Sequence, residues 1–380
     1  MIKHWVPAYL QDSRDAWQAD PRNTNLKWFQ DAGFGLFLHF SPASVLDGGA
    51  DAWKAVDVTF QRIHERFHEF TDDQYEYWMD TIFTDAAIDA SIRRVWDRFR
   101  PDQFDADRIA ALAVAAGMKY ITFTTRHVMG RLFLFKTRLS PCNSVDLPPH
   151  RDFVAELAGA CRKHHLGLFL YVMPPFDDEK ERVKGMLTEL LQQYGPIAGI
   201  WFDGISRYYS RPDCFADISR KYHLIRSLQP GCLISFKTGA TGEEDFIAPE
   251  WQQCTYAPDG RAELASPFRD MVARHPRRKV LRYSAKKGFH HCRESCREVW
   301  ETSLRHKPLE ICTTMQEGNN WFNCDGVRHR RGDEVLSMLT QAHSAGGNLL
   351  LNAGPRGDGS MHPEDETALR ETGERLHRSP

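Results

Sequence analysis

The sequence is short of the features that mark nucleic-acid-binding and membrane proteins. Its 380 residues contain 49 Lys and Arg against 51 Asp and Glu, with no block of like charge. Proteins that bind nucleic acids or anionic membranes usually carry basic patches, so this balance argues against both partners. No apolar run reaches the roughly 18 residues of a membrane-spanning helix. We therefore expect neither a nucleic acid nor a membrane as a partner.

Signals for secretion and for a disulfide framework are also missing. The first residues, MIKHWVPAYLQDSRD, contain no apolar core and no small-residue cleavage site, so they do not form a secretory signal. The nine cysteines are scattered without framework spacing, which is typical of free thiols in a reducing compartment. The sequence predicts a cytoplasmic protein.

Sequence motifs for metals, nucleotides and serine nucleophiles are absent. The sequence contains no HExxH, Walker A loop or GxSxG elbow, and no GxGxxG after a strand. One cluster, HHCRESC, places His290, His291, Cys292 and Cys296 close together. Structural zinc sites usually bring a second paired motif, and none accompanies this one. We expect no metal and no cofactor.

What the sequence does contain is an alternation of short apolar runs with amphipathic segments. The apolar runs do not alternate internally with polar residues, which favours strands buried on both faces in a parallel sheet. With six such strands and no dinucleotide fingerprint, a (β/α)8 TIM-like barrel is favoured over an open doubly wound sheet. The strands are expected at residues 34–40, 119–126, 166–173, 197–204, 232–237 and 347–354, and the helices at 105–117, 151–167, 183–195 and 334–347.

One region interrupts this rhythm. Residues 43–100 are helical in composition and lie between the first and second expected strands. We interpret them as a helical insertion in the first βα loop, where they can help to wall a site. No internal repeat or Pro/Ser-rich linker divides the chain, so residues 1–380 are expected to form a single domain.

Polar residues stand where several expected strands end. The first strand ends in His39, the second in Arg126 and His127, the fourth in Asp203 and the fifth in Lys237, and Glu250 follows soon after. In a parallel barrel these ends share one face, which is where active sites lie. Asp203 alone can equally be the N-cap of a following helix. Histidines and carboxylates that converge from separate strands suit a hydrolase for a polyhydroxylated substrate.

Aromatic residues make up 12% of the chain, with ten Trp and 23 Phe. Flat aromatic rings pack against the apolar face of a sugar, but large hydrophobic cores also use many of them. From composition alone, we interpret these aromatic residues as part of the hydrophobic core rather than of a sugar-binding site.

Six blocks of the sequence, in one order, resemble the α-L-fucosidases of glycoside hydrolase family 29. The most specific is SAGGNLLLNAGPRGDGSMHPE, which resembles the family pattern KGGNLLLNIGPxxDGxIPxE. The resemblance implies a retaining exo-glycosidase on a (β/α)8 barrel, without the C-terminal β-sandwich that the family often adds. It also implies a fucosylated oligosaccharide or glycoconjugate as substrate. The blocks cover residues 28–45, 99–127, 200–204, 244–251, 309–323 and 344–364.

The resemblance assigns roles to particular residues. Asp203 falls on the position of the family nucleophile, and the IAPE match makes Glu250 the acid/base, with Glu243 and Glu244 in reserve. His39 and His127 match histidines that hold fucose hydroxyls. Phe37, Trp201 and Trp321 match the wall against the C5-methyl group, and Lys237 stands where the family has an arginine.

The chain also departs from the family pattern. Its RHVMGR (126–131) replaces KHHDGF, so that Val128 and Met129 stand where a histidine and an aspartate are expected. The exchange of arginine for Lys237 loses a planar fork of donors. Three alternatives follow: a glycosidase for a different sugar, a carbohydrate-binding pseudoenzyme on the same barrel, and a metal-dependent hydrolase built on His39, His127 and Asp203.

Overall fold

The computed structural model describes most of the chain outside the expected insertion. Of residues 43–100 it describes only 43–46 and 90–100, so the predicted insertion lies largely outside the described residues, as do Val128, Met129 and the cluster at 290–296. The described residues are 5–46, 90–127, 131–173, 180–204, 213–256, 262–264, 298–318 and 320–378.

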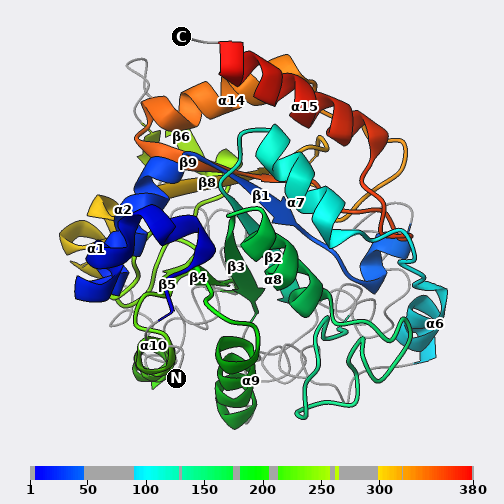
Figure 1. The fold of residues 1–380 in the computed structure, drawn as a ribbon, viewed down its shortest axis with the longest axis horizontal. Helices are drawn as coiled ribbons and strands as arrows, with labels where there is room; N and C mark the ends of the chain where they lie inside the picture. Colours follow the sequence, from blue (N-terminus) through cyan, green and yellow to red (C-terminus); the bar gives the residue numbers. More distant parts are fainter. Residues whose placement is uncertain are drawn as a thin grey trace, which may run out of the picture.

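Seven parallel strands form the central sheet, in the order β5-β4-β3-β2-β1-β9-β8. The predicted α/β fold with a parallel sheet is therefore confirmed. Almost every residue of these strands is buried, as the unbroken apolar runs predict. Figure 1 shows the sheet curled, with helices on its outer side. The strands are β1 (Phe34–Leu38), β2 (Tyr120–Arg126), β3 (Gly167–Val172), β4 (Gly199–Phe202), β5 (Leu233–Phe236), β8 (Leu309–Thr314) and β9 (Gly347–Asn352).

One of these strands, β8, was missing from the strands expected from the sequence. It contains Glu310, Thr313 and Thr314 among its apolar residues, and these polar side chains hide the apolar run. All three are nevertheless buried. A charged residue in a buried strand needs partners inside the fold, and those of Glu310 lie near the candidate site described below.

The segment 246–250 lies between the two edge strands of the sheet. On one side, Ser235 of β5 pairs with Phe246 in a parallel bridge. On the other side, Ile247 pairs with Leu309 of β8, and Glu250 pairs with Cys312 of the same strand. Backbone bonds therefore connect both edges of the sheet through this short segment.

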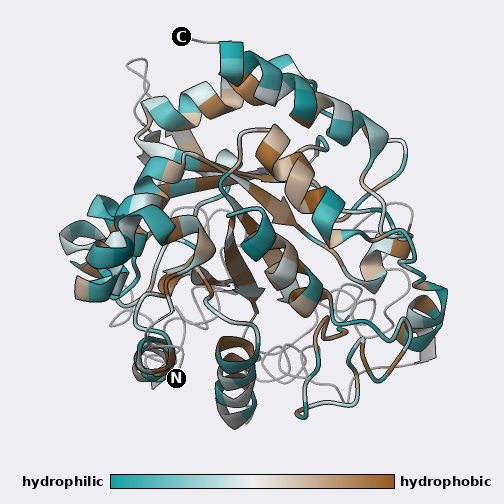
Figure 2. Cartoon of the chain, in the orientation of Figure 1, coloured by the Kyte–Doolittle hydropathy of each residue, from teal (hydrophilic) through white to brown (hydrophobic). Residues whose placement is uncertain are grey.

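The helices that cover the sheet begin at side-chain caps where the sequence offers an aspartate. Asp105 accepts a hydrogen bond from the backbone N–H of Arg108 (3.0 Å), and Asp152 accepts one from Ala155 (2.9 Å). Figure 2 shows the brown, hydrophobic strands inside and teal, hydrophilic residues on the helices around them. The four expected helices correspond to α7 (Ala106–Ala115), α8 (Phe153–Lys163), α9 (Lys180–Gln193) and α14 (Gly332–Ser344).

Further helices complete the outer layer. One of them, α6 (Ala90–Arg98), lies in the region 43–100 that was expected to be helical, and the others were not singled out from the sequence. Within the described residues, no helix is both long and apolar enough to cross a membrane. The additional α-helices are α1 (Arg14–Ala19), α2 (Pro21–Ala32), α6 (Ala90–Arg98), α10 (Asp213–Leu228) and α15 (Pro363–Arg378); two short antiparallel strands, β6 (Cys254–Tyr256) and β7 (Ala262–Leu264), form a separate sheet.

A buried polar cluster holds the connection between β8 and α14 (residues 315–331) against α15. His329 Nδ1 lies 2.6 Å from Asp365 Oδ1, and the other ring nitrogen accepts from the amide of Gln316 at 3.0 Å. That amide orientation is fixed, because Gln316 also bonds both the N–H and the C=O of Cys324. The C-terminal helix thus anchors a loop that contributes aromatic residues to the site.

We predict that His329→Ala destabilises the protein by about 3–5 kcal/mol, because it leaves the buried carboxylate of Asp365 without its partner. Urea unfolding followed by circular dichroism measures the loss. The neighbouring exposed residue provides a control: Glu364→Gln should change the free energy of unfolding by no more than about 0.5 kcal/mol. Equal effects of the two variants would contradict the anchoring role.

Candidate active site

The predicted strand-end residues lie together at the carboxyl ends of the parallel strands. The rings of His39 and His127 are 5.6 Å apart, which places the ends of β1 and β2 at one site. Lys237, just after β5, reaches both Asp203 after β4 and Glu250 in the bridging segment. The charges of Asp203 and Lys237 also act on His127. Residues from four separate parts of the sequence therefore form one cluster.

Asp203 is held by two hydrogen-bond donors. Its Oδ1 accepts the backbone N–H of Gly204 at 2.6 Å, and its Oδ2 accepts the hydroxyl of Tyr171 at 2.8 Å. An N-cap side chain instead accepts from the second or third residue of its helix, and the next described helix, α10, begins only at Asp213. The geometry favours a carboxylate that belongs to the site.

The charge state of Asp203 follows from its surroundings. Burial by itself raises its pKa, but the ammonium of Lys237, the N–H of Gly204 and the hydroxyl of Tyr171 together lower it below the usual value. Asp203 is therefore an anion at neutral pH, which is the form that a carboxylate nucleophile requires.

Lys237 bridges the two carboxylates. Its Nζ lies 2.9 Å from Glu250 Oε1 and 3.8 Å from Asp203 Oδ1. Burial disfavours its charge, yet the two carboxylates outweigh burial and raise its pKa. Its backbone adopts the left-handed region (φ 49°), a conformation that costs a side-chain-bearing residue about 1–2 kcal/mol. The contacts of its side chain with Asp203, Glu250 and Trp201 help to hold the backbone in this conformation.

The separation of Asp203 and Glu250 is limited by their shared contact. Their two bridged oxygens are no farther apart than the sum of their distances to Lys237 Nζ. Retaining glycosidases hold their carboxyl groups about 5–5.5 Å apart and inverting ones about 6.5–9.5 Å apart. The limit on this pair of oxygens admits the first spacing. The side chain of Glu250 is also the less exposed of the two, at 17% against 26%.

Aromatic rings line the site around Lys237. Phe37 lies edge-on to both Trp201 and Trp321, with ring centroids 5.3 and 5.9 Å apart. Tyr171 stacks on Trp201 at 5.7 Å. The ammonium of Lys237 lies 4.9 Å from the Trp201 ring centre, within the range of a cation–π interaction. The rings supply an apolar wall beside the charged groups.

The two histidines of the site are neutral at pH 7. His39 Nδ1 donates to Asn352 Oδ1 at 2.9 Å, because that oxygen also accepts the backbone N–H of His39 and is therefore an acceptor. Burial and the neighbouring His127 hold the pKa of His39 well below its usual range. Burial lowers the pKa of His127 to about 4, although the charge of Asp203 opposes this. Neutral imidazoles can exchange hydrogen bonds with hydroxyl groups.

The two reserve acids, Glu243 and Glu244, have partners elsewhere. The buried carboxylate of Glu244 accepts backbone N–H bonds from the turn at residues 240–242 and the hydroxyl of Tyr222. Glu243 accepts the hydroxyl of Ser219 at 2.5 Å in α10. These bonds stabilise the turn after β5, and Glu250 is the glutamate that contacts Lys237.

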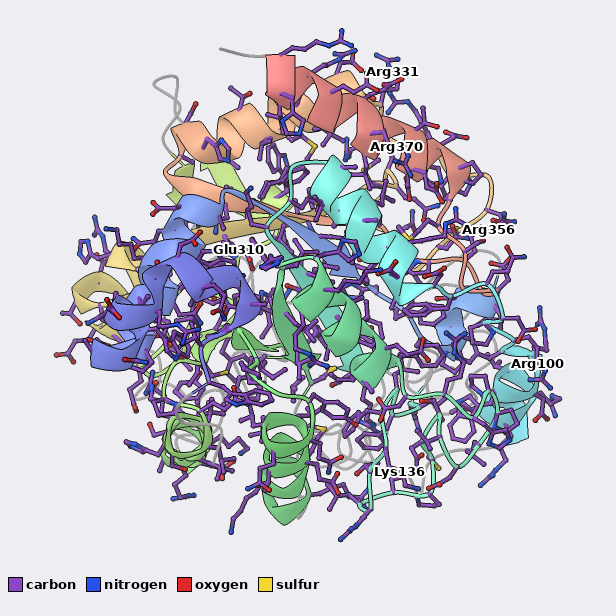
Figure 3. All side chains as sticks on the ribbon, in the orientation of Figure 1. Arg100, Lys136, Glu310, Arg331, Arg356 and Arg370 are labelled. Carbon is purple, nitrogen blue, oxygen red and sulfur yellow. The ribbon has the colours of Figure 1, made fainter. Side chains whose placement is uncertain are left out.

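Sequence reasoning missed three residues that support the site: Tyr171, Asn352 and Glu310. Glu310 is 1% exposed, and it accepts the Tyr120 hydroxyl and the Trp201 indole N–H, each at 2.8 Å. Burial raises its pKa to about 7, although the two hydrogen bonds and Lys237 oppose this. Figure 3 shows Glu310 inside the ring of helices, whereas the labelled arginines lie toward the outside. The sequence signal that could have found Glu310 was a single acidic residue in a short, otherwise uncharged segment, LEICTT (309–314).

Metal binding was one of the alternatives for this site. Among the residues that the structure describes, no group of three or more His, Cys, Asp or Glu side chains is arranged to hold a metal ion. His39, His127 and Asp203 do not form such a group.

The fold and site together define a class. A curled parallel sheet that carries two carboxylates, a cation between them and aromatic walls at its strand ends is typical of glycoside hydrolases. A family model described as Alpha-L-fucosidase matches residues 7–379. The chain belongs to the alpha-L-fucosidase family and is a glycoside hydrolase.

Curated relatives from animals agree with this assignment, and solved structures of bacterial proteins share the fold. The mouse tissue alpha-L-fucosidase is 26% identical over 368 residues, covering 95% of this chain and 71% of that protein. The human tissue enzyme is 26% identical, covering 92% of this chain and 67% of that protein. In fold, the chain resembles alpha-L-fucosidase isoenzyme 1 from Paenibacillus thiaminolyticus, with a TM-score of 0.61, 21% identity, and coverage of 94% and 76%. It also resembles AlfC from Lactobacillus casei in complex with alpha-L-fucose product, with a TM-score of 0.60, 21% identity, and coverage of 93% and 98%.

We predict that kcat/KM on an aryl α-L-fucoside shows no acidic limb with a midpoint above about pH 5. This parameter reports the ionisation of free-enzyme groups. The two histidines stay neutral and Asp203 stays ionised as the pH falls from neutrality, because all three pKa values are lowered. Initial rates across the pH range provide the measurement. An acidic limb near pH 6.5 that disappears in His127→Gln would contradict the neutral, buried state of the histidine.

Proposed function

We propose that the chain hydrolyses terminal α-L-fucosyl residues by a retaining mechanism, with Asp203 as nucleophile and Glu250 as acid/base. The observation that carries this proposal is the contact of one cation, Lys237, with both carboxylates at the strand ends. It brings together the two groups that a retaining glycosidase needs, at a spacing compatible with that mechanism.

In the first step, an oxygen of Asp203 attacks the anomeric carbon and the bond to the leaving oxygen breaks. Tyr171 and Gly204 hold the attacking carboxylate in place, and Lys237 keeps it ionised. Glu250 gives its proton to the leaving oxygen, so that the aglycone departs as an alcohol. The products of this step are the free aglycone and a covalent fucosyl-enzyme.

In the second step, Glu250 takes a proton from a water molecule, which attacks the anomeric carbon and releases Asp203. Two inversions leave the product with the α configuration. For Glu250 to begin the cycle as an acid, its contact with Lys237 has to open. The flexible side chain of the lysine permits this movement, and the ammonium then forms an ion pair with Asp203 alone.

The glycone pocket combines an apolar wall with neutral histidines. Phe37, Trp201 and Trp321 can receive the C5-methyl group of fucose, which contributes about 1–3 kcal/mol of discrimination against a sugar without it. His39 and His127 are placed to bond sugar hydroxyls. This pocket supports fucose or a close analogue as the glycone.

We further infer that the catalytic domain is a closed (β/α)8 barrel. The segment 246–250 supports this, since it bonds to both β5 and β8 and so takes the place of an eighth strand. Residues 43–100 begin within η3 (Pro42–Val45), a few residues after β1 and His39, and this position in the sequence supports the proposal that they help to wall the site.

The assignment of the two carboxylates can be tested by chemical rescue. We expect Asp203→Gly to lower turnover by several orders of magnitude, because the covalent step loses its nucleophile. Azide should restore turnover of an activated fucoside and give the β-fucosyl azide, since it attacks in the place of the carboxylate. Rescue that gives the α-azide would remove Asp203 as nucleophile.

For Glu250→Ala we expect about a 100- to 10,000-fold loss on poor leaving groups and a much smaller loss on activated aryl groups. Azide should now give the α-fucosyl azide, because the fucosyl-enzyme still forms on Asp203. Glu243→Ala is the matched control and should keep wild-type rates, since that side chain bonds to α10. Loss of activity in Glu243→Ala and its retention in Glu250→Ala would reverse the assignment.

Substrate specificity is tested with a panel of aryl glycosides that places the α-L-fucoside beside the α-L-galactoside and the β-D-galactoside. We expect the wild type to turn over the α-L-fucoside at the highest kcat/KM, because its methyl group meets the aromatic wall. Preference for another glycoside would assign the site to a different sugar. A folded protein that is inactive on every glycoside would indicate a pseudoenzyme.

A further inference from the structure

Glu310 is a buried carboxylate with no step assigned to it in the mechanism above. It lies in β8, where successive side chains point to opposite faces of the sheet. Cys312, two residues further on, packs in the cluster that contains Phe37 and Trp201, whereas Ile311 packs in the other cluster. The side chain of Glu310 therefore lies on the same inner face as Trp201. Burying a carboxylate costs several kcal/mol, and an apolar residue in the same place would often serve packing equally well. The position therefore points to a more specific use of the charge.

The carboxylate connects two inner strands of the sheet. Its Oε1 accepts from Tyr120 at the start of β2, and its Oε2 accepts from the indole of Trp201 near the end of β4. The indole N–H is the only polar group of the tryptophan side chain, so this bond distinguishes one orientation of the ring from its flipped alternative. Glu310 thus fixes which way the Trp201 ring faces.

The orientation of Trp201 matters to the charged groups beside it. Its ring lies 4.9 Å from the ammonium of Lys237 and stacks on Tyr171, whose hydroxyl holds Asp203. A flipped or tilted ring would change both contacts. Glu310 therefore acts on Asp203 through the indole ring of Trp201 and through Lys237 and Tyr171, which the ring contacts.

We propose that Glu310 is a positioning residue: by bonding the indole of Trp201, it holds Lys237 and Tyr171 in the places from which they align Asp203. Glu310 touches neither the sugar nor the reacting atoms. This inference rests on the function proposed above, because it concerns the alignment of the same nucleophile. Small displacements of a reacting group are costly, since attack requires close and aligned contact.

The test uses Glu310→Leu, which fills the position with an apolar side chain and leaves the indole N–H of Trp201 without its acceptor. We expect kcat/KM on an aryl α-L-fucoside to fall about tenfold to a hundredfold, mainly through kcat. Unchanged kcat/KM would overturn the proposal.

Two further variants separate positioning from general stability. Tyr120→Phe leaves the bond between Glu310 and Trp201 intact and should keep wild-type activity. In Glu310→Gln the amide oxygen can still accept the indole N–H of Trp201 while the NH2 group donates to the hydroxyl oxygen of Tyr120, so this variant should keep most of the activity that Glu310→Leu loses. A loss in Glu310→Gln as large as that in Glu310→Leu would show a merely structural role and overturn the proposal.

An independent measurement applies to the wild-type protein, in case Glu310→Leu does not fold. The indole resonance of Trp201 is the one missing from a ¹⁵N-labelled Trp201→Phe variant. We expect its N–H to exchange slowly with solvent, because it is buried and bonded; immediate exchange would overturn the proposal. Failure of the proposed function has a different signature, namely a wild type inactive on fucosides or an active Asp203→Gly.

Discussion

The candidate site depends on the ion pairs that the ammonium group of Lys237 makes with Asp203 and Glu250. Two carboxylates converge on one buried region, and without a cation between them they would repel one another and at least one would be neutral. Lys237 removes that conflict and keeps Asp203 ionised. The cost of placing it there is visible in its left-handed backbone and its desolvated charge. Rigid surroundings are needed to sustain such a residue.

Those surroundings come from aromatic rings and from polar residues deep in the sheet. The ring of Trp201 lies against the ammonium of Lys237, and Glu310 accepts a hydrogen bond from the indole N–H of Trp201. Asn352 in β9 plays a similar part for His39, by accepting bonds from both its ring and its backbone. Asp203, Lys237 and His39 thus each contact a buried residue of a neighbouring strand, namely Tyr171, Trp201 and Asn352. These contacts keep the groups preorganised for substrate.

The sequence predicted the parts of the molecule that depend on local pattern. Strands buried on both faces are readable from their apolar runs, and residues after parallel strands must meet at one end, so the convergence of His39 and Asp203 could be expected. Only the family resemblance favoured Glu250 among three glutamates. The residues alone left that choice open, because it depends on whether each side chain faces the turn, α10 or the site. The strand β8 was also hidden, since Glu310 is tolerable there only through bonds to residues more than a hundred positions away. Such pairings are set by the tertiary fold and leave no local pattern.

The segment 246–250 has a consequence for the way in which the enzyme loses activity. Its backbone is attached to both edges of the sheet by only a few bonds, and it ends at Glu250. A local opening at either edge would carry Glu250 away from Lys237, whereas Asp203 sits after an interior strand and would stay in place. Proteins open first where their local stability is lowest. With Glu250 as the acid/base proposed above, turnover therefore reports the local stability of this segment, and activity is lost while most of the hydrophobic core is still folded.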